Sequence, residues 1–247
     1  MKPTYIASCS FGKDSIATIL LALENNEPLD RVVFAEVMFD HSRGISGEIP
    51  EHIEWVYSTA IPKLEAMGVK VDVVRAERDY LYFFQNTLGR GRHKGKIYSF
   101  PIAGMCVINR DCKINPIRKY LKQFDDVVQY IGIAKDERSR LDRLDGVSKI
   151  SLLDKYGYTE AMARAKAEEY GLLSPIYESS FRNGCWFCPN CSIKQFGRFR
   201  KAHPDLWGEL VRLSHTPNLC SYGFKYGKTV QDVEKMIEWN ERQLKLF

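Results

Sequence analysis

Short apolar segments alternate with helix-periodic segments over the first half of the chain. Segments of strand length, either apolar or alternating, lie at residues 5–7, 31–39, 69–74 and 126–133. Segments whose apolar side chains recur every three or four positions lie between them, at residues 16–23, 50–67 and 116–123. Because strands separated by helices pair in parallel, this pattern predicts an α/β fold with a doubly wound parallel sheet.

The pattern changes after about residue 144. Helical periodicity predicts helices over residues 160–170, 193–214 and 229–246, with a cysteine-bearing loop before the second of them. The sequence therefore predicts an α/β domain over residues 1–143 and a C-terminal α-helical region over residues 144–247.

Composition excludes few classes of protein. The 247 residues are 45% hydrophobic and 27% charged, which is typical of a globular protein. No run of eighteen apolar residues occurs, and the N-terminus leads into a strand without the apolar core of a signal peptide. We therefore expect a soluble, cytoplasmic protein with no membrane partner.

The connection between the first strand and the first helix has the composition of a phosphate-binding loop. It reads Ser10-Phe11-Gly12-Lys13-Asp14-Ser15. Backbone N–H groups at a helix N-terminus point at a bound anion. Ser10 and Ser15 offer hydroxyl donors. Lys13 offers a positive charge, and Asp14 can cap the helix or help to hold Mg²⁺.

This loop resembles the Ser-Gly-Gly-x-Asp-Ser signature of the PP-loop superfamily, which includes ATP pyrophosphatases, tRNA thiolases and phosphoadenosine phosphosulfate (PAPS) reductases. Phe11 stands at the first glycine, as is common in the PAPS reductase branch. Residues 158–161, 173–177, 184–190 and 203–207 look like PAPS reductase-like proteins that phages and mobile elements often encode. The resemblance implies a PP-loop fold that binds ATP or a related adenine nucleotide together with Mg²⁺.

A second segment, residues 130–140, looks like the Gly-x-Arg-x-x-Glu-Ser-x-x-Arg segment of PAPS reductases. Gly132, Glu137 and Arg140 match it, whereas Ala134 and Arg138 depart from it. Gly132 would let the backbone approach the nucleotide, and Arg140 suits a bidentate contact with phosphate or sulfate.

Together the two resemblances imply a set of site residues. Catalytic roles fall to Lys13, Asp14 and Arg140. Nucleotide contacts are expected at Ser8, Ser10, Phe11, Gly12, Lys13, Asp14, Ser15, Asp40, Gly132, Asp136, Glu137 and Arg140. Asp40 ends the second strand, where it could contact the nucleotide, position Mg²⁺ or simply cap the strand. His41 and His52 are expected to be surface or helix residues and not catalytic bases.

Three cysteines crowd into seven residues. Cys185, Cys188 and Cys191 form two overlapping C-x-x-C pairs, a spacing that lets neighbouring thiolates face one metal centre. Cys112 is the best candidate for a fourth ligand, and Cys106 is the alternative. Four thiolates suit zinc and an iron–sulfur cluster equally. The resemblance of the Cys112 segment to iron–sulfur adenylylsulfate reductases favours iron.

Two further cysteines and a basic segment complete the candidate chemistry. Cys9 is expected to be a small buried hydrophobe, and Cys220 a structural or redox thiol. The net charge is +5, and five basic residues fall in the glycine-bearing stretch 88–96. Such a stretch predicts a mobile loop, either merely solvated or in contact with phosphates.

Three functions remain open from the sequence. The first is an enzyme that attacks the α-phosphate of ATP with a substrate oxygen and so adenylates or thiolates a nucleic-acid, sulfur-carrier or small-molecule substrate. The second is a sulfonucleotide reductase, for which the family's C-terminal Glu-Cys-Gly motif is missing from residues 241–247. The third is a nucleotide sensor without turnover. The missing motif favours the first function.

Overall fold

The structure, a computed structural model, describes residues 2–102, 104–179 and 183–244. The chain forms two compact units that interleave along the sequence. We call Met1–Glu36, Glu48–Ala76 and Lys113–Gly184 the sheet unit. We call Val37–Gly47, Glu77–Cys112 and Cys185–Phe247 the cysteine unit. The boundary expected at residue 143 therefore falls inside the sheet unit and does not coincide with a division between the two.

A five-stranded sheet forms the centre of the sheet unit. Its strands are β1 (Thr4–Cys9), β2 (Arg31–Glu36), β5 (Val71–Arg75), β6 (Val127–Ile131) and β7 (Lys149–Ile150). They are ordered β5-β2-β1-β6-β7, and every neighbouring pair is parallel. The α/β fold with a parallel sheet is thereby confirmed.

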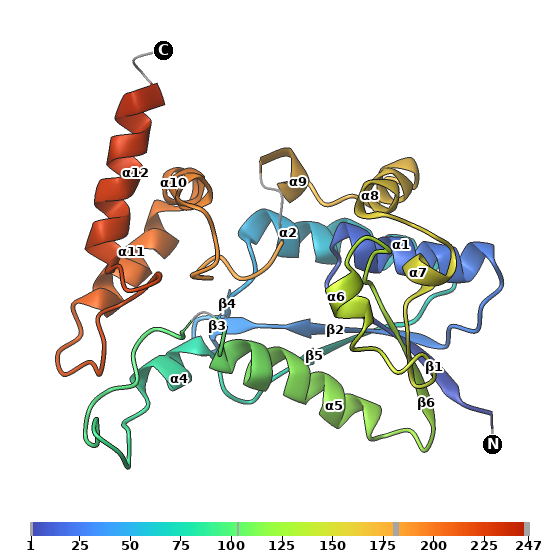
Figure 1. The fold of residues 1–247 in the computed structure, drawn as a ribbon, viewed down its shortest axis with the longest axis horizontal. Coiled ribbons are helices and arrows are strands. Elements are labelled where there is room, and N and C mark those ends of the chain that lie inside the picture. Colours follow the sequence, from blue (N-terminus) through green and yellow to red (C-terminus); the bar gives the residue numbers. More distant parts are fainter. Residues whose placement is uncertain (1, 103, 180–182, 245–247) are drawn as a thin grey trace. The chain divides into compact units, whose positions relative to one another are not determined.

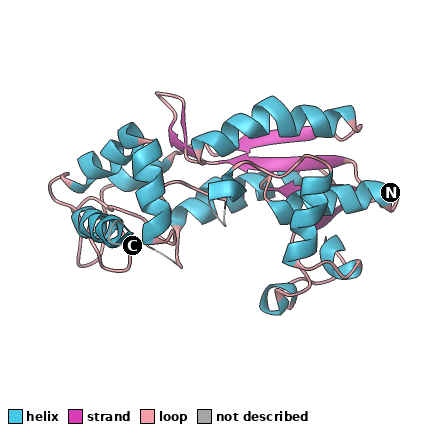
Figure 2. Cartoon of the chain, turned by 90° about the horizontal axis from the view of Figure 1, so that it is seen from above, coloured by secondary structure: helices cyan, strands magenta, loops and turns pink. Residues whose placement is uncertain are grey.

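Helices pack on both faces of this sheet, which is why its central strands are apolar on both sides. On one face Ala7 and Val32 belong to the core shared with α1 (Lys13–Glu24) and α8 (Glu160–Glu169). On the other face Ile6 and Val33 pack with residues of α5 (Asn115–Leu121). Figure 1 shows α1 and α5 on opposite sides of the strands, and Figure 2 shows the same layers from above.

The remaining helices of the sheet unit are short or interrupted. The helix expected over residues 50–67 runs as α2 (Pro50–Trp55), a π-helical turn (Val56–Ala60) and α3 (Ile61–Ala66). Pro62 lies just after the π turn and has no N–H to continue the regular ladder, which explains the wider turn. The others are α6 (Arg138–Leu141), α7 (Leu152–Lys155) and α9 (Ile176–Ser179).

The cysteine unit is mostly helical around a cluster of aromatic rings. It contains β3 (Met38–Asp40), β4 (Ile45–Ser46), α4 (Tyr80–Gln85), most of a π-helical segment (Asn109–Ile114), α10 (Ile193–Ala202), α11 (Pro204–Ser214) and α12 (Val230–Leu244). The Phe39 and Trp186 ring centroids are 4.6 Å apart, and those of Tyr80 and Phe187 are 4.2 Å apart. These rings form the buried centre of the unit.

Two strand and helix predictions for this region were wrong in detail. The strand expected over 31–39 is divided at Val37, because β3 pairs in antiparallel with β4 and leaves the main sheet. The helix expected over 193–214 breaks at His203, whose backbone is not helical (φ −132°, ψ 66°). Pro204 disfavours the helical conformation of the residue before it, so α11 starts anew at Pro204.

None of the helices in the described part of the chain combines the length and the apolar character that a membrane crossing requires.

Candidate phosphate-binding site

The order of strands places two of the predicted segments at one point of the sheet unit. From β1 the chain proceeds through α1 to β2 on one side, whereas β6 lies beside β1 on the other side. Connections that leave neighbouring strands in opposite directions open a crevice at the carboxyl ends of those strands. Residues 10–15, the Ser10 loop, follow β1, and residues 132–140, the Gly132 segment, follow β6.

Phe11 gives the Ser10 loop its turn. Its φ is +54°, a left-handed conformation that glycine adopts much more readily than other residues. The signature that this loop resembles has a glycine at this position. The side chain is fully buried, with its ring edge-on to Phe34 at 5.1 Å. This packing holds a strained backbone in place, so Phe11 shapes the loop from inside.

Gly12 caps helix α1 without a side-chain hydrogen bond among the described residues. The first turn of a helix carries N–H groups that the helix itself does not use, and these are the groups that bind anions. A Cβ at Gly12 would lie 2.9 Å from Asn183 Nδ2 and 3.0 Å from the Tyr177 hydroxyl. A side chain at this position would therefore require Asn183 and Tyr177 to shift away from the loop.

Ser15 holds the loop together. Its hydroxyl donates to the Gly12 carbonyl (3.0 Å) and accepts the Ser10 N–H (3.3 Å), and the Cys9 thiol donates to it (3.4 Å). The single hydroxyl proton of Ser15 is therefore used within the loop. Cys9 is buried, as expected, and burial raises its pKa to about 11, so it stays a neutral thiol.

Lys13 is tied to two carboxylates. Its ammonium lies 2.8 Å from Asp14 Oδ1 and 2.9 Å from Glu160 Oε2 at the start of α8. Burial lowers the pKa of Lys13, but the two carboxylates outweigh this and raise it above its usual value. Burial raises the pKa of Asp14, against the effect of Lys13. The site thus holds a charged lysine. A phosphate that binds Lys13 must displace Asp14 and Glu160 from its ammonium group or bind beside them.

Two side chains distant in sequence contact the Ser10 loop. The Tyr177 hydroxyl accepts the backbone N–H of Lys13 (3.0 Å), which is one of the free amides of the first turn of α1. Asn183 Nδ2 donates to the Ser10 carbonyl (3.0 Å) and approaches its hydroxyl (3.3 Å). The Tyr177 oxygen therefore occupies a position that a phosphate oxygen could take.

His52 contacts the Ser10 loop through its imidazole ring. Its ring is buried, with Nδ1 2.8 Å from the Ser174 hydroxyl and Nε2 3.1 Å from the Ser10 carbonyl. Because a carbonyl can only accept, Nε2 carries the proton and Nδ1 accepts from Ser174. His52 is a helix residue, as expected, but it is not at the surface.

The Gly132 segment packs directly against the start of α1. A Cβ at Gly132 would lie 2.8 Å from the carbonyl carbon of Asp14 and 2.8 Å from the backbone nitrogen of Ser15. Farther along, Arg140 pairs with Glu137 (2.5 Å), and Asp136 accepts the backbone N–H of Glu160 (3.1 Å). The segment is therefore built onto α1 and α8, and the absence of a side chain at Gly132 permits the contact.

Ser8 and Asp40 take part in other contacts. Ser8, on β1, accepts a hydrogen bond from Gln129 on β6 (2.5 Å). Asp40 is buried in the cysteine unit and pairs with Arg43 (2.6 Å) while accepting from Ser42 (2.6 Å). Burial alone would raise the pKa of Asp40, but these hydrogen bonds lower it to about 2. In the structure Asp40 caps the turn that follows β3.

The three clustered cysteines lie on two successive turns of the cysteine unit. The Cys188 N–H donates to the Cys185 carbonyl, and the Cys191 N–H to the Cys188 carbonyl, each at 3.0 Å. Lys225 closes the loop by donating to the carbonyls of Pro189 (2.7 Å) and Cys191 (2.6 Å). This backbone suits a set of thiolate ligands.

The cysteine side chains are not grouped as metal ligands in this structure. Among the described residues no three His, Cys, Asp or Glu side chains are grouped so as to hold a metal ion, and no cysteine is in a disulfide. The Cys112 thiol donates to the Arg78 carbonyl (3.4 Å). The metal centre therefore remains a prediction, with Cys106 and Cys112 both open as its fourth ligand.

Comparison with known proteins identifies no family. No family model matches the sequence, and no curated protein matches it. Among solved structures the chain is similar to the U34-tRNA thiolase NcsA from Methanococcus maripaludis with its [4Fe-4S] cluster, at a TM-score of 0.43 and 16% identity. The match covers 95% of this chain and 81% of the thiolase. A similarity of this size transfers neither the thiolase's substrate nor its cluster to this chain.

Proposed function

We propose that the protein is a PP-loop enzyme that binds ATP or a related adenine nucleotide and cleaves it at the α-phosphate to adenylate or thiolate a substrate. One observation carries the proposal: the Ser10 loop and the Gly132 segment, the two stretches with nucleotide-site resemblance, follow the two strands that flank the switch point of the sheet.

The chemistry follows from the groups at this point. A substrate oxygen attacks the α-phosphorus, the bond to the bridging oxygen breaks, and pyrophosphate leaves with the negative charge. Amides of the first turn of α1 and the Lys13 ammonium would stabilise that charge, and Mg²⁺, held with the help of Asp14, would supply a further positive charge. Arg140, half-exposed at the end of the Gly132 segment and paired with Glu137, would contact a phosphate or sulfate oxygen.

The product of the reaction separates this function from its alternatives. Incubation with labelled ATP and candidate substrates, among them nucleic acids and sulfur carriers, should release AMP and pyrophosphate. Sulfite released from PAPS would instead identify a sulfonucleotide reductase. Tight binding without either product would identify a nucleotide sensor.

Gly12→Val should weaken ATP binding by at least ~10-fold. The valine side chain would clash with Asn183 and Tyr177 and displace the loop from the N-terminus of α1. Gly208→Val is the matched control, because a Cβ at Gly208 meets no atom within 4 Å. Titration calorimetry of both variants with ATP measures the effect. Unchanged affinity in Gly12→Val would show that the nucleotide binds elsewhere.

We also propose that the cysteine unit binds zinc or an iron–sulfur cluster through Cys185, Cys188 and Cys191 and a fourth cysteine. Cys188→Ser should lose most of the bound metal, as measured by elemental analysis and by absorption in the iron–sulfur charge-transfer region. Cys106→Ser and Cys112→Ser, compared in the same assay, identify the fourth ligand. Metal content that is the same in wild type and Cys188→Ser would reject the site.

A further inference from the structure

The positive charge of the chain is concentrated in the cysteine unit. That unit contains 17 Lys and Arg against 10 Asp and Glu, and the sheet unit contains 19 against 21. The net charges are therefore +7 and −2, which together give the +5 of the chain. A basic surface confined to one unit attracts anionic partners to that unit.

Much of this charge is carried by an ordered hairpin over residues 88–97. The Leu88 N–H donates to the Lys96 carbonyl (2.9 Å), and the Gly95 N–H donates to the Leu88 carbonyl (2.8 Å). Gly91 and Gly95 have φ of +79° and +81°, so the glycines form its turns. The stretch predicted to be a mobile loop thus forms a hairpin with internal hydrogen bonds, which we call the basic hairpin.

The basic hairpin is also fixed to the rest of its unit. The Ile97 N–H donates to the Asn218 carbonyl (2.9 Å), and the Cys220 N–H donates to the Ile97 carbonyl (2.8 Å). The Asn218 side chain donates to the Gly95 carbonyl (2.9 Å). An ordered support lowers the conformational entropy that the hairpin itself would lose on binding a partner.

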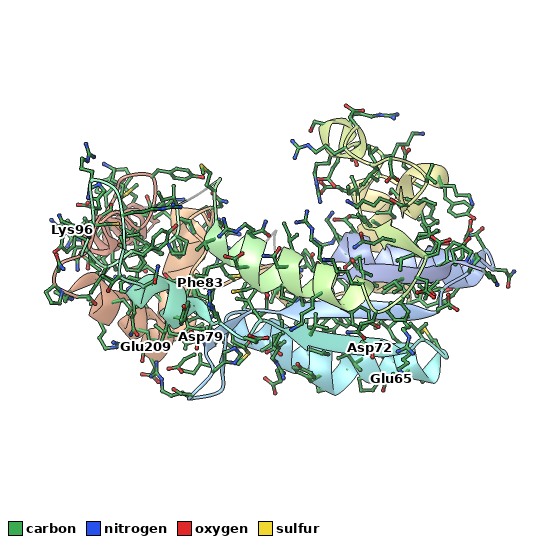
Figure 3. The ribbon with its side chains drawn as sticks, turned by 90° about the horizontal axis from the view of Figure 1, so that it is seen from below. Glu65, Asp72, Asp79, Phe83, Lys96 and Glu209 are labelled. Carbon is green, nitrogen blue, oxygen red and sulfur yellow. The ribbon has the colours of Figure 1, made fainter. Side chains whose placement is uncertain are left out.

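The cations of the hairpin face solvent without counter-charges. Arg90, Arg92, Lys94 and Lys96 are exposed, and none of them takes part in an ion pair that the described residues form. Figure 3 labels Lys96 at the outer edge of this unit. Other arginines of the same unit do pair with carboxylates, namely Arg43, Arg200 and Arg212. Four like charges held close together without partners favour an external polyanion.

Two exposed aromatic rings follow the segment that supports the hairpin, and the hydroxyl of one of them, Tyr226, donates to Asn190 Oδ1 (2.7 Å). The segment that pairs with the hairpin continues through Ser221, whose carbonyl accepts from Ser99, to Tyr222 and Tyr226. Tyr222 is 50% exposed and Tyr226 is 69% exposed. Lys225 lies 4.7 Å from the Tyr226 ring centroid. Exposed rings beside cations are the combination that binds single-stranded nucleic acids, whose bases stack on the rings.

We propose that the basic hairpin, with Tyr222 and Tyr226, binds single-stranded nucleic acid. The claim that this nucleic acid is the substrate rests on the proposed adenylating or thiolating function. The claim that the surface binds nucleic acid rests on the cysteine unit alone. The cations contact phosphates and the tyrosines stack on bases. Smaller anions would not use four cations and two rings together.

The test compares two variants with the same change of charge. The hairpin variant replaces Arg90, Arg92, Lys94 and Lys96 by Gln. The control replaces Lys2, Lys70, Arg118 and Lys122 by Gln; these are exposed residues of the sheet unit that take part in no described ion pair. Binding of a labelled single-stranded RNA of mixed sequence is measured by fluorescence anisotropy over a range of salt concentrations.

Wild type and control should bind alike, and the hairpin variant should lose affinity. Each phosphate contact adds about 0.7 to the salt slope for single strands, so four lost contacts should reduce the slope by ~3 and the affinity by ~2 to 3 orders of magnitude at about 0.1 M salt. Tyr222→Ala and Tyr226→Ala should each weaken binding by about fivefold or more without changing the slope. ATP affinity should be unchanged in all variants.

Three results would overturn the proposal: no RNA or single-stranded DNA binding by wild type, equal losses in the hairpin variant and its control, or tighter binding of duplex than of single strands with no effect of the tyrosines. The last two point to general charge attraction and to duplex backbone recognition. Because ATP binding and turnover are measured on the same variants, a failure here leaves the proposed function standing, and a failure of ATP binding leaves this surface standing.

Discussion

Gly132→Ala is expected to abolish detectable nucleotide binding and to destabilise the sheet unit. The new Cβ would lie 2.8 Å from the backbone of both Asp14 and Ser15. Backbone atoms cannot rotate away as the end of a side chain can, so β6 and the first turn of α1 must separate. Forced insertions into packed sites cost about 1–3 kcal/mol, and the displaced turn carries the amides that we propose bind phosphate. Urea unfolding and ATP titration measure the two effects.

Gly208→Ala is the matched control for this change. It also adds one methyl group to a glycine, but nothing lies within 4 Å of the new atom, and alanine favours the helix in which it stands. Its stability should be equal to that of wild type or higher. A Gly132→Ala variant that loses ATP binding at unchanged stability would mean that the residue contacts the nucleotide and does not serve the packing of α1.

The elements that carry the nucleotide site could be predicted because their signals are local. An apolar strand, a turn rich in glycine and serine, and a helix-periodic segment follow one another within about twenty residues, and the structure forms β1, the Ser10 loop and α1 from them. The parallel sheet followed from repetition of the same unit. The break at His203 had a local signal too, the following proline, which the apolar periodicity of residues 193–214 concealed.

The contacts that shape the site could not be predicted in the same way. Tyr177 and Asn183 reach the Ser10 loop from 164 and 173 residues away, and no pattern around either residue marks that contact. Phe11 was noted as a departure from a glycine, but its positive φ is maintained by burial against Phe34, which only the fold reveals. The interleaving of the two units is likewise a property of long-range contacts.

The contact of His52 with the Ser10 loop is another long-range contact that the sequence does not reveal, and it leads to a second prediction with a large expected effect. His52→Phe should weaken ATP binding by about 10-fold and lower the free energy of unfolding by about 1–3 kcal/mol. The ring volume is retained, but the Ser10 carbonyl keeps only the Asn183 donor (3.0 Å), and the buried Ser174 hydroxyl loses its acceptor at 2.8 Å. Buried polar groups left without a partner cost about this much. Because Ser10 begins the loop, its carbonyl sets the direction of the amides that follow.

Two comparisons separate this positioning role from general damage. His52→Gln retains a donor near the position of Nε2 and should recover part of the ATP affinity. His215→Phe is the control, since that ring also contacts a carbonyl, Val211 at 2.8 Å, but is exposed in the cysteine unit. Equal ATP affinity in His52→Phe and wild type would show that the loop keeps its shape without the ring.

The pH dependence of stability tests the burial of the same ring. Burial lowers the pKa of His52 below its usual 6.5; Glu48 and the hydrogen bond to the Ser10 carbonyl raise it, Lys113 lowers it, and burial dominates. The folded protein therefore keeps His52 neutral at a pH where the unfolded chain takes up a proton. The stabilisation is complete above pH 6.5 and decreases as the pH falls below that value. Urea unfolding of wild type and His52→Phe between pH 5 and about 7.5 should show a difference in stability that shrinks toward acid pH, whereas a constant difference would mean that the pKa of the ring is not lowered by burial in the folded protein.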